Sequence, residues 1–192
     1  MKNDEHLFKI LKESLEKSAL DLGAYRATVI PTDQIVTDRV FRDMCAANYC
    51  GMYGKCHMCP PDVGEIDELM AELKNYSFAL VYQTVTSLED SFDFEGMSEA
   101  KKNTVKIALA LRELFSKSDI SRVLHLGAGG CGVCEVCSKR IGEDCRFPEL
   151  ALPSLEAYGV NVSELAKSAG MKYINGQDTV TYFGAVLFDN IQ

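Results

Sequence analysis

Residues 78–126 decide the fold class, and they read FALVYQTVTSLEDSFDFEGMSEAKKNTVKIALALRELFSKSDISRVLHL. Phe78–Val85 is an apolar run of the length typical of a buried strand, and Val123–Leu126 is a second, shorter one. Between them, Ser98–Phe115 repeats apolar residues at helical spacing. A strand, a helix and a strand in this order favour an α/β layer with at least partly parallel strands.

The same two periodicities extend outward toward both ends of the chain. The expected helices lie between Asn3 and Gly23, at Ile66–Leu73 after a capping box of Asp62 and Glu65, and at Val162–Ala169; the expected strands are Ala24–Ile30 and Thr179–Phe188. The last strand is expected to pair antiparallel with its predecessor. The predicted fold is therefore α/β (or α+β): a mixed β-sheet flanked by helices, with two cysteine-rich loops that follow strands.

Length and charge limit the architecture and the class of partner. A chain of 192 residues with 47% hydrophobic residues is long enough for one sizeable core, so residues 1–192 are expected to form a single domain. The net charge of −8 and the pI near 4.9 argue against nucleic acid as a partner, because phosphate binding needs clustered Lys and Arg. A basic or neutral protein partner is expected instead.

The sequence also indicates a compartment. It contains no run of about 18 apolar residues, and its N-terminus is charged and amphipathic, without a signal-peptide core or cleavage site. We therefore expect no membrane association and a cytoplasmic location. In that reducing environment the eight cysteines do not suit a disulfide framework, which makes metal ligation the leading explanation for them.

The second cysteine group lies in LGAGGCGVCEVCSKRIGEDCRFP, residues 126–148. Its members are Cys131, Cys134, Cys137 and Cys145. The first three form a C-x-x-C-x-x-C triplet, which is typical of iron–sulfur binding, whereas paired C-x-x-C units define zinc sites. The glycines of 127–132 leave backbone N–H groups free to point at a cluster. We expect these four cysteines to hold one [4Fe-4S] cluster.

The first cysteine group lies in CAANYCGMYGKCHMCPP, residues 45–61. Its members are Cys45, Cys50, Cys56 and Cys59. Four local thiolates could hold a second [4Fe-4S] cluster, but Cys56 and Cys59 could equally join two other cysteines around zinc. Crossed ligation is a further alternative, in which Cys59 and Cys145 exchange sites. His57 is interpreted as a neighbour of the ligands rather than as a ligand.

Several isolated polar residues give weaker signals. Lys55 and Arg146 stand beside cysteines, where each could hydrogen-bond an anionic cluster or simply be solvated. His125, inside an apolar strand, is interpreted as a core residue. Glu149 and Glu156 could act as acid–base groups near the second cysteine group, but capping or surface roles are expected for such isolated carboxylates.

Both cysteine blocks in this order, followed by CRFPE at 145–149 and PSLEAYGV at 153–160, resemble a family of small prokaryotic predicted metal-binding proteins, domain of unknown function 2284. The likeness spans most of the chain. It implies cysteine ligands at Cys45, Cys50 and Cys59 in the first block, with Cys56 as an addition in this chain. If Cys56 binds, the first cluster is closed and suits electron transfer; if it does not, one iron is open to a small molecule.

These observations predict an iron–sulfur protein that binds two [4Fe-4S] clusters, loses iron in air and acts as an electron-transfer or accessory redox protein with a redox partner protein. One alternative is a redox enzyme with an open iron and a small-molecule ligand at the Cys45–Cys59 loop, which would account for a scaffold larger than a ferredoxin needs. Another is a zinc-stabilised interaction module, which leaves the cysteine triplet unexplained.

Overall fold

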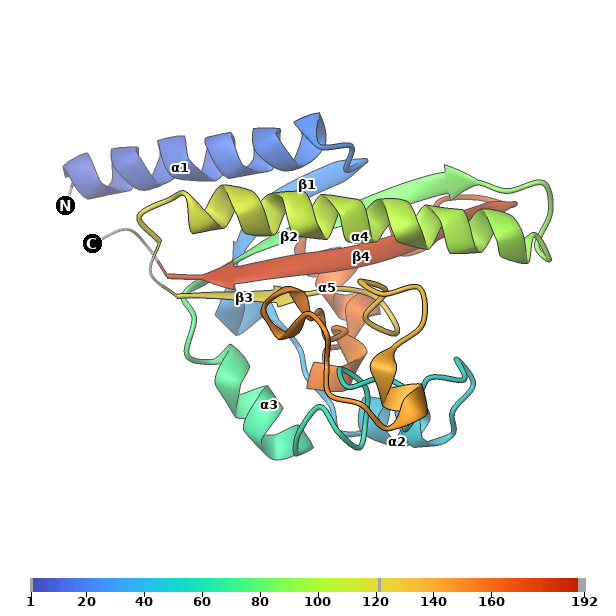
Figure 1. Cartoon of the computed structure of the whole chain (residues 1–192). Helices are drawn as coiled ribbons and strands as arrows, with labels where there is room; N and C mark the ends of the chain where they lie inside the picture. The colour runs from blue at the N-terminus through green and yellow to red at the C-terminus, as the bar shows by residue number, and fades with distance from the viewer. Residues whose placement is uncertain (1, 121, 190–192) are drawn as a thin grey trace.

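A computed structural model describes residues 2–120 and 122–189, and one four-stranded sheet lies at its centre. Across the sheet the strands stand in the order β1 (Arg26–Pro31), β2 (Phe78–Ser87), β4 (Thr179–Phe188) and β3 (Val123–Leu126). The long strands β2 and β4 pair along their whole length at the centre of the sheet, whereas the short strands β1 and β3 form its edges (Figure 1).

All three ladders of the sheet are antiparallel. A sheet flanked by helices is confirmed, as is the antiparallel pairing of β4 with β3. The expectation of a mixed sheet with partly parallel strands is wrong. Strands β2 and β3 do run in the same direction, but β4 lies between them and pairs with both.

The sheet buries both of its faces. Successive residues of a strand point to opposite sides, so Leu80 and Tyr82 of β2 join one core while Ala79 and Val81 join the other. Because neither side of β2 faces water, its sequence is a continuous apolar run rather than an alternating one.

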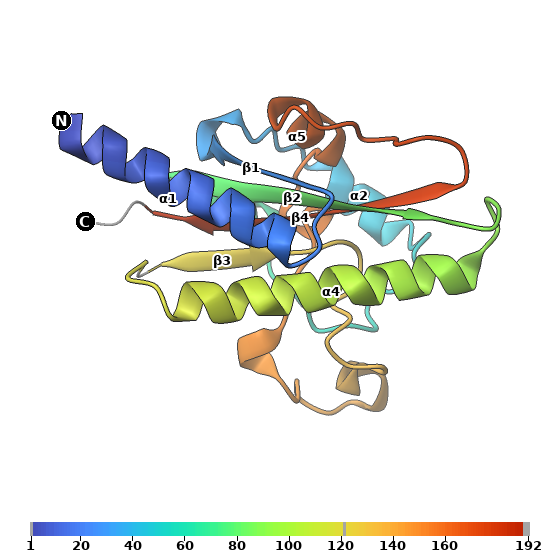
Figure 2. The same cartoon turned by 90° about the horizontal axis from the view of Figure 1, so that it is seen from above.

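Helices α1 (Lys2–Asp21) and α4 (Phe94–Ser116) cover one face of the sheet (Figures 1 and 2). Leu15 of α1 and Leu111 of α4 are buried against the strands on this side. None of the described helices is both long enough and apolar enough to cross a lipid bilayer. This face of the molecule is a helix-on-sheet core, against which Cys131 also packs.

The opposite face carries shorter elements and the cysteine loops. Helices α2 (Val40–Ala46), α3 (Ile66–Leu73) and α5 (Val162–Ser168) lie here, together with the 3-10 turns η1 (Thr32–Gln34), η2 (Ser138–Ile141), η3 (Pro148–Leu150) and η4 (Glu156–Tyr158). The second cysteine loop follows β3 directly, as predicted. The first follows β1 only after η1 and α2.

The N-caps correct the predicted start of α4 and the predicted capping of α3, whose bounds Ile66–Leu73 are confirmed. The Asp93 carboxylate accepts a hydrogen bond from the Gly96 N–H at 2.7 Å, so α4 begins at Phe94, before the predicted residue 98. Glu65 is the N-cap of α3 but makes no side-chain cap hydrogen bond, so the predicted capping box with Asp62 is wrong.

Candidate metal centre

The loop that carries the cysteine triplet leaves the sheet at Gly127. The Gly127 N–H donates to the Pro153 carbonyl at 2.8 Å, and the Gly127 carbonyl accepts from the Leu155 N–H at 3.0 Å. A Cβ at residue 127 would lie 2.7 Å from the Leu152 side chain, so only glycine allows this close backbone contact. The contact fixes the point at which the loop departs toward α4.

The first cysteine loop begins in the last turn of α2, which contains Cys45. Asn48 then adopts a left-handed conformation with φ of 58°, and its side-chain oxygen accepts a hydrogen bond from the Tyr53 N–H at 3.0 Å. The Gly54 N–H donates to the Pro60 carbonyl at 2.9 Å. These bonds fold the segment into a compact loop instead of an extended arm.

Side-chain contacts hold the two cysteine loops together. Nε2 of His57 donates to the Glu143 carbonyl at 2.9 Å, and the Lys139 ammonium pairs with the Asp62 carboxylate. His57 thus bridges the loops through a backbone oxygen, a use that agrees with its interpretation as a neighbour of the ligands.

The Cys56 thiol faces the second cysteine group, although Cys56 belongs to the first group by sequence. Its sulfur accepts hydrogen bonds from the Cys131 N–H and from the Cys137 thiol, and its residue is only 1% exposed. Cys131 in turn lies close enough to Cys134 for a charge on Cys134 to raise the pKa of Cys131. The structure therefore gathers Cys56 with the triplet, which is neither the local grouping nor the exchange of Cys59 and Cys145.

The Cys59 thiol faces the remaining members of the first group. Its pKa is raised by its hydrogen bond to Cys56, then by burial, and then by the nearby charges of Cys50 and Cys45. Cys59 is 6% exposed, whereas Cys50 lies at the surface. Cys45, Cys50 and Cys59 thus form a three-thiol group of their own.

The two groups meet at the contact between Cys59 and Cys56. The hydrogen bond with Cys59 lowers the pKa of Cys56 to about 5 even though burial opposes the shift. The same contact raises the pKa of Cys59, so this contact favours the thiolate form at Cys56. A thiolate is the form of cysteine that binds metals.

Backbone N–H groups point at the Cys131 sulfur. The Leu152 N–H donates to it at 3.3 Å, and the Val133 N–H donates to it as well. Burial raises the pKa of Cys131, and these two donors act against that rise. Amide hydrogen bonds to cysteine sulfur are the contacts that tune metal–thiolate centres.

A cavity of about 680 Å³ opens beside the triplet. The cysteines that line it are Cys56, Cys131, Cys134, Cys137 and Cys145. Lys101 and Lys102 of α4 and Arg140 of η2 also line it, so positive charge surrounds the thiols. The volume is that of a cofactor or small-molecule site, for which roughly 300–1,000 Å³ is usual.

The donor side chains do not converge on a single point. Among residues 2–120 and 122–189, no group of three or more His, Cys, Asp or Glu side chains converges closely enough to hold one metal ion. Instead, five cysteines are spread around one cavity.

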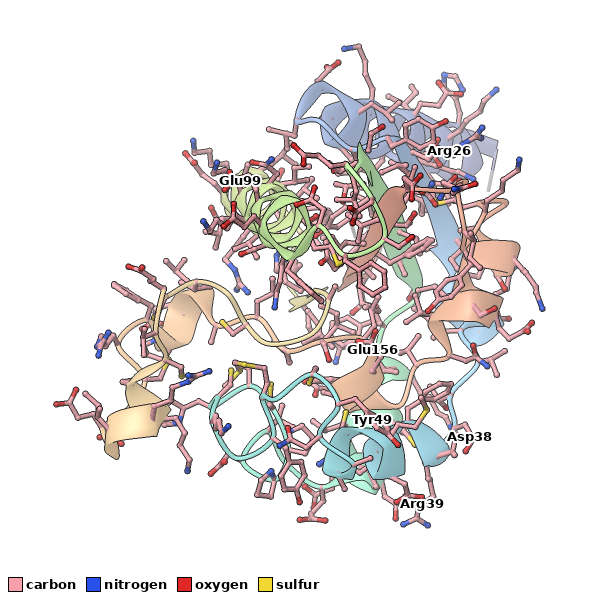
Figure 3. All side chains as sticks on the ribbon, turned by 90° about the vertical axis from the view of Figure 1, so that its right-hand side faces the viewer. Arg26, Asp38, Arg39, Tyr49, Glu99 and Glu156 are labelled. Carbon is pink, nitrogen blue, oxygen red and sulfur yellow. The ribbon has the colours of Figure 1, made fainter. Side chains whose placement is uncertain are left out.

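Glu156 lies beside the first cysteine group, not near the second. Burial, and next the charge of Glu156, raise the pKa of Cys45. Oε2 of Glu156 is buried and has no hydrogen-bond partner among the described residues. Figure 3 shows Glu156 on η4 between the sheet and α2, with Tyr49 beyond it at the surface. The sequence predicted no such role, because Glu156 and Cys45 are distant along the chain.

The other polar residues considered as candidates from the sequence either lie apart from the thiols or form hydrogen bonds within a cysteine loop. Arg146 donates to the Val136 carbonyl at 3.4 Å within its own loop, while Lys55 and Glu149 are exposed. His125 is a core residue, 5% exposed, with its ring edge-on to Phe115. Its Nδ1 has no hydrogen-bond partner among the described residues.

Comparison with known proteins identifies a family but no characterised counterpart. The family model described as "Predicted metal-binding protein (DUF2284)" matches residues 28–188, which include both cysteine loops and Glu156. No curated protein and no solved structure matches the chain. Because the match covers most of the 192 residues, the chain belongs to the DUF2284 family of predicted metal-binding proteins.

Proposed function

We propose that this protein is an iron–sulfur electron carrier with two cluster sites that adjoin at Cys56 and Cys59. One [4Fe-4S] site is formed by Cys56, Cys131, Cys134 and Cys137; the other takes its thiolates from Cys45, Cys50 and Cys59. The observation that carries the proposal is the hydrogen-bonded contact of Cys56 and Cys59, whose thiols face different groups.

The groups around the triplet suit an anionic redox centre. A bound [4Fe-4S] cluster supplies one-electron transfer. The N–H donors of Leu152 and Val133 stabilise negative charge on the Cys131 sulfur, and Lys101 adds positive charge at the cavity wall. Both effects favour the reduced state and raise the reduction potential of the site.

The closeness of the two groups supports a carrier. Cys56 and Cys59 are in hydrogen-bond contact, so iron on one sulfur would be near iron on the other. Cys50 lies at the surface by the first group, and the cavity opens beside the second. Electrons could therefore arrive at one group and leave from the other. With a net charge of −8, the protein would attract a basic or neutral redox partner.

Anaerobic reconstitution with iron and sulfide tests this proposal. The expected product contains about eight irons and eight sulfides per chain, as two four-iron clusters require, and its broad visible absorption is bleached on chemical reduction. A colourless protein with stoichiometric zinc would reject the carrier and favour the zinc-stabilised interaction module.

A redox enzyme with an open iron is the second candidate. The observation that favours it is the number of thiols in the first group: with Cys56 turned toward the triplet, three remain. The iron without a thiolate would then accept a small molecule, and the second group would supply electrons. Titration of the reduced protein with cyanide, followed by electron paramagnetic resonance (EPR), detects an iron that binds small molecules. Catalytic turnover of a bound small molecule favours the enzyme, whereas electron exchange with a partner protein alone favours the carrier.

A further inference from the structure

We infer that the Glu156 carboxylate is the fourth ligand of the first group, where it completes the set of Cys45, Cys50 and Cys59 with an oxygen donor. The inference rests on the proposed iron–sulfur function and supplies a ligand for the iron that lacks a thiolate.

The first group needs a ligand that is not cysteine. A cubane cluster has four irons to be held, and the group offers three thiols. Cys56 is hydrogen-bonded to Cys131 and Cys137, and Cys145 lines the cavity at the triplet. All eight cysteines of the chain are thereby placed.

Backbone contacts hold Glu156 at a fixed position relative to α2, the helix that contains the first cysteine. Arg42 of α2 donates through Nη2 to the Ala157 carbonyl at 3.1 Å. The Asp38 N–H, just before α2, donates to the Gly159 carbonyl at 2.7 Å. The turn η4 is thus fastened to α2 by two bonds that directly follow Glu156, and the carboxylate remains beside the first thiol group.

The Glu156 carboxylate has an unused acceptor in the interior. Its Oε2 is buried without a hydrogen-bond partner among the described residues, and its charge already acts on the Cys45 thiol. Burial of a carboxylate is strongly unfavourable unless a cation or a metal compensates it. An iron held by the neighbouring thiolates would provide that compensation.

Arg42 is the competing explanation for the buried carboxylate. Its Nε is also buried without a partner among the described residues, and it too lies near Cys45. In that case Glu156 would only balance the charge of the guanidinium. The two roles differ in what replaces Glu156: a metal ligand can be exchanged for cysteine, whereas a counter-charge to arginine cannot be exchanged for a thiol without loss.

An oxygen ligand would make this position exchangeable. Carboxylate binds iron less strongly than thiolate does in a sulfur-rich site, so an incoming thiol or cyanide can displace it. The iron–oxygen bond breaks as the new bond forms, and no electron is transferred. The first site would therefore be closed at rest and open to small thiols or anions.

The test compares Glu156→Gln and Glu156→Cys with Glu149→Gln, a matched control at an exposed glutamate. After anaerobic reconstitution, wild type and E149Q are expected to hold about eight irons, whereas E156Q falls toward about four because only the triplet site stays filled. E156C regains the iron through a fourth thiolate and loses the response of the EPR signal to cyanide.

Two results would overturn the inference. E156Q could bind as much iron as wild type with the same cyanide response, or E156C could fail to regain the iron that E156Q loses. In each case two clusters in wild type would leave the proposed function intact. Failure of wild type to bind iron would instead reject the proposed function itself.

Discussion

Cys56 and Cys59 are separated by two residues, yet their side chains belong to different thiol groups. The Cys59 N–H donates to the Cys56 carbonyl at 3.0 Å, which marks a tight turn between them. The turn sends one thiol toward Cys137 and leaves the other with Cys45 and Cys50. Membership of a group is thus decided by the turn and not by distance along the sequence.

Cysteine substitutions test this division. Cys56→Ala is expected to remove the cluster of the triplet and leave about four irons, whereas Cys145→Ala leaves about eight because Cys56 supplies the fourth thiolate. Cys50→Ala, the control for the other group, removes the first cluster instead. Iron analysis after anaerobic reconstitution checks all three variants. Iron loss in C145A together with full iron in C56A would assign Cys145 as the ligand.

His125 predicts an acid-sensitive component of stability. Burial, together with the charge of Arg112, lowers the pKa of His125 to about 3, against about 6.5 in an unfolded chain. Between those values the unfolded state binds a proton that the folded state does not bind. The contribution of His125 to the free energy of unfolding is therefore complete above pH 6.5 and is lost as the pH falls toward 3.

The apo protein allows this effect to be measured. Between pH 7 and pH 5, wild type should lose about 2 kcal/mol more of its free energy of unfolding than His125→Leu loses. Denaturant titrations of both proteins at the two pH values give the difference. Equal losses in the two proteins would show that folding does not lower the pKa of His125.

The sequence was informative about which residues form the site but not about how they are shared. Two groups of cysteines were visible from their spacing. The matching family is itself described as predicted metal-binding, which agrees with metal ligation by these cysteines. The position of Cys56 was not visible, because the four-residue turn from Cys56 to Cys59 sets the direction of its side chain. Glu156 was missed because hydrogen bonds between η4 and α2, far apart in sequence, bring it to Cys45.

At the scale of elements, apolar runs predicted strand positions well and strand directions badly. The bounds of β3 and β4 agree with the predicted Val123–Leu126 and Thr179–Phe188, since both are bounded by polar residues. The unit of β2, α4 and β3 was expected to give adjacent parallel strands. Insertion of β4 between β2 and β3 makes every ladder antiparallel, and no local pattern encodes that long-range choice.

Gly184 supports the centre of the sheet by its lack of a side chain. It lies opposite Tyr82 in the ladder of β2 and β4, and a Cβ at residue 184 would overlap the Tyr82 ring. Gly184→Ala should therefore lower the free energy of unfolding by about 1–3 kcal/mol through overpacking. Thermal or denaturant unfolding measures the loss.

A double variant separates overpacking from backbone effects at residue 184. Tyr82→Leu shortens the side chain that the new methyl group would meet. The cost of Gly184→Ala should be smaller in the Tyr82→Leu background than in wild type. The same cost in both backgrounds would contradict a steric origin.

At the scale of the whole molecule, the helix-covered sheet and the cysteine loops form two layers. Helices α1 and α4 cover one face of the sheet. The cysteine loops form a separate layer, which adjoins α4 where Lys101 and Val105 line the cavity. The cysteine layer is held by loop contacts such as His57 with the Glu143 carbonyl, whereas β2 and β4 share a long hydrogen-bonded ladder. The two layers should therefore respond differently to metal removal.

Hydrogen exchange can reveal that difference. Removal of iron by a chelator should increase amide exchange in residues 45–63 and 127–150, because metal binding contributes folding energy to the segments that ligate it. Amides of β2 and β4 should remain protected. Uniform deprotection of the sheet and the loops would contradict a stable scaffold with a metal-dependent layer.

We propose that two clusters lie on either side of the Cys56–Cys59 contact. EPR spectroscopy of the fully reduced, anaerobically reconstituted protein is the sharpest test, because two paramagnetic centres that lie this close together broaden and split each other's signals. We expect an interaction spectrum in wild type that collapses to the signal of one isolated cluster in Cys56→Ala. Two independent, uncoupled signals in wild type, or a single cluster there, would contradict a pair of adjoining clusters.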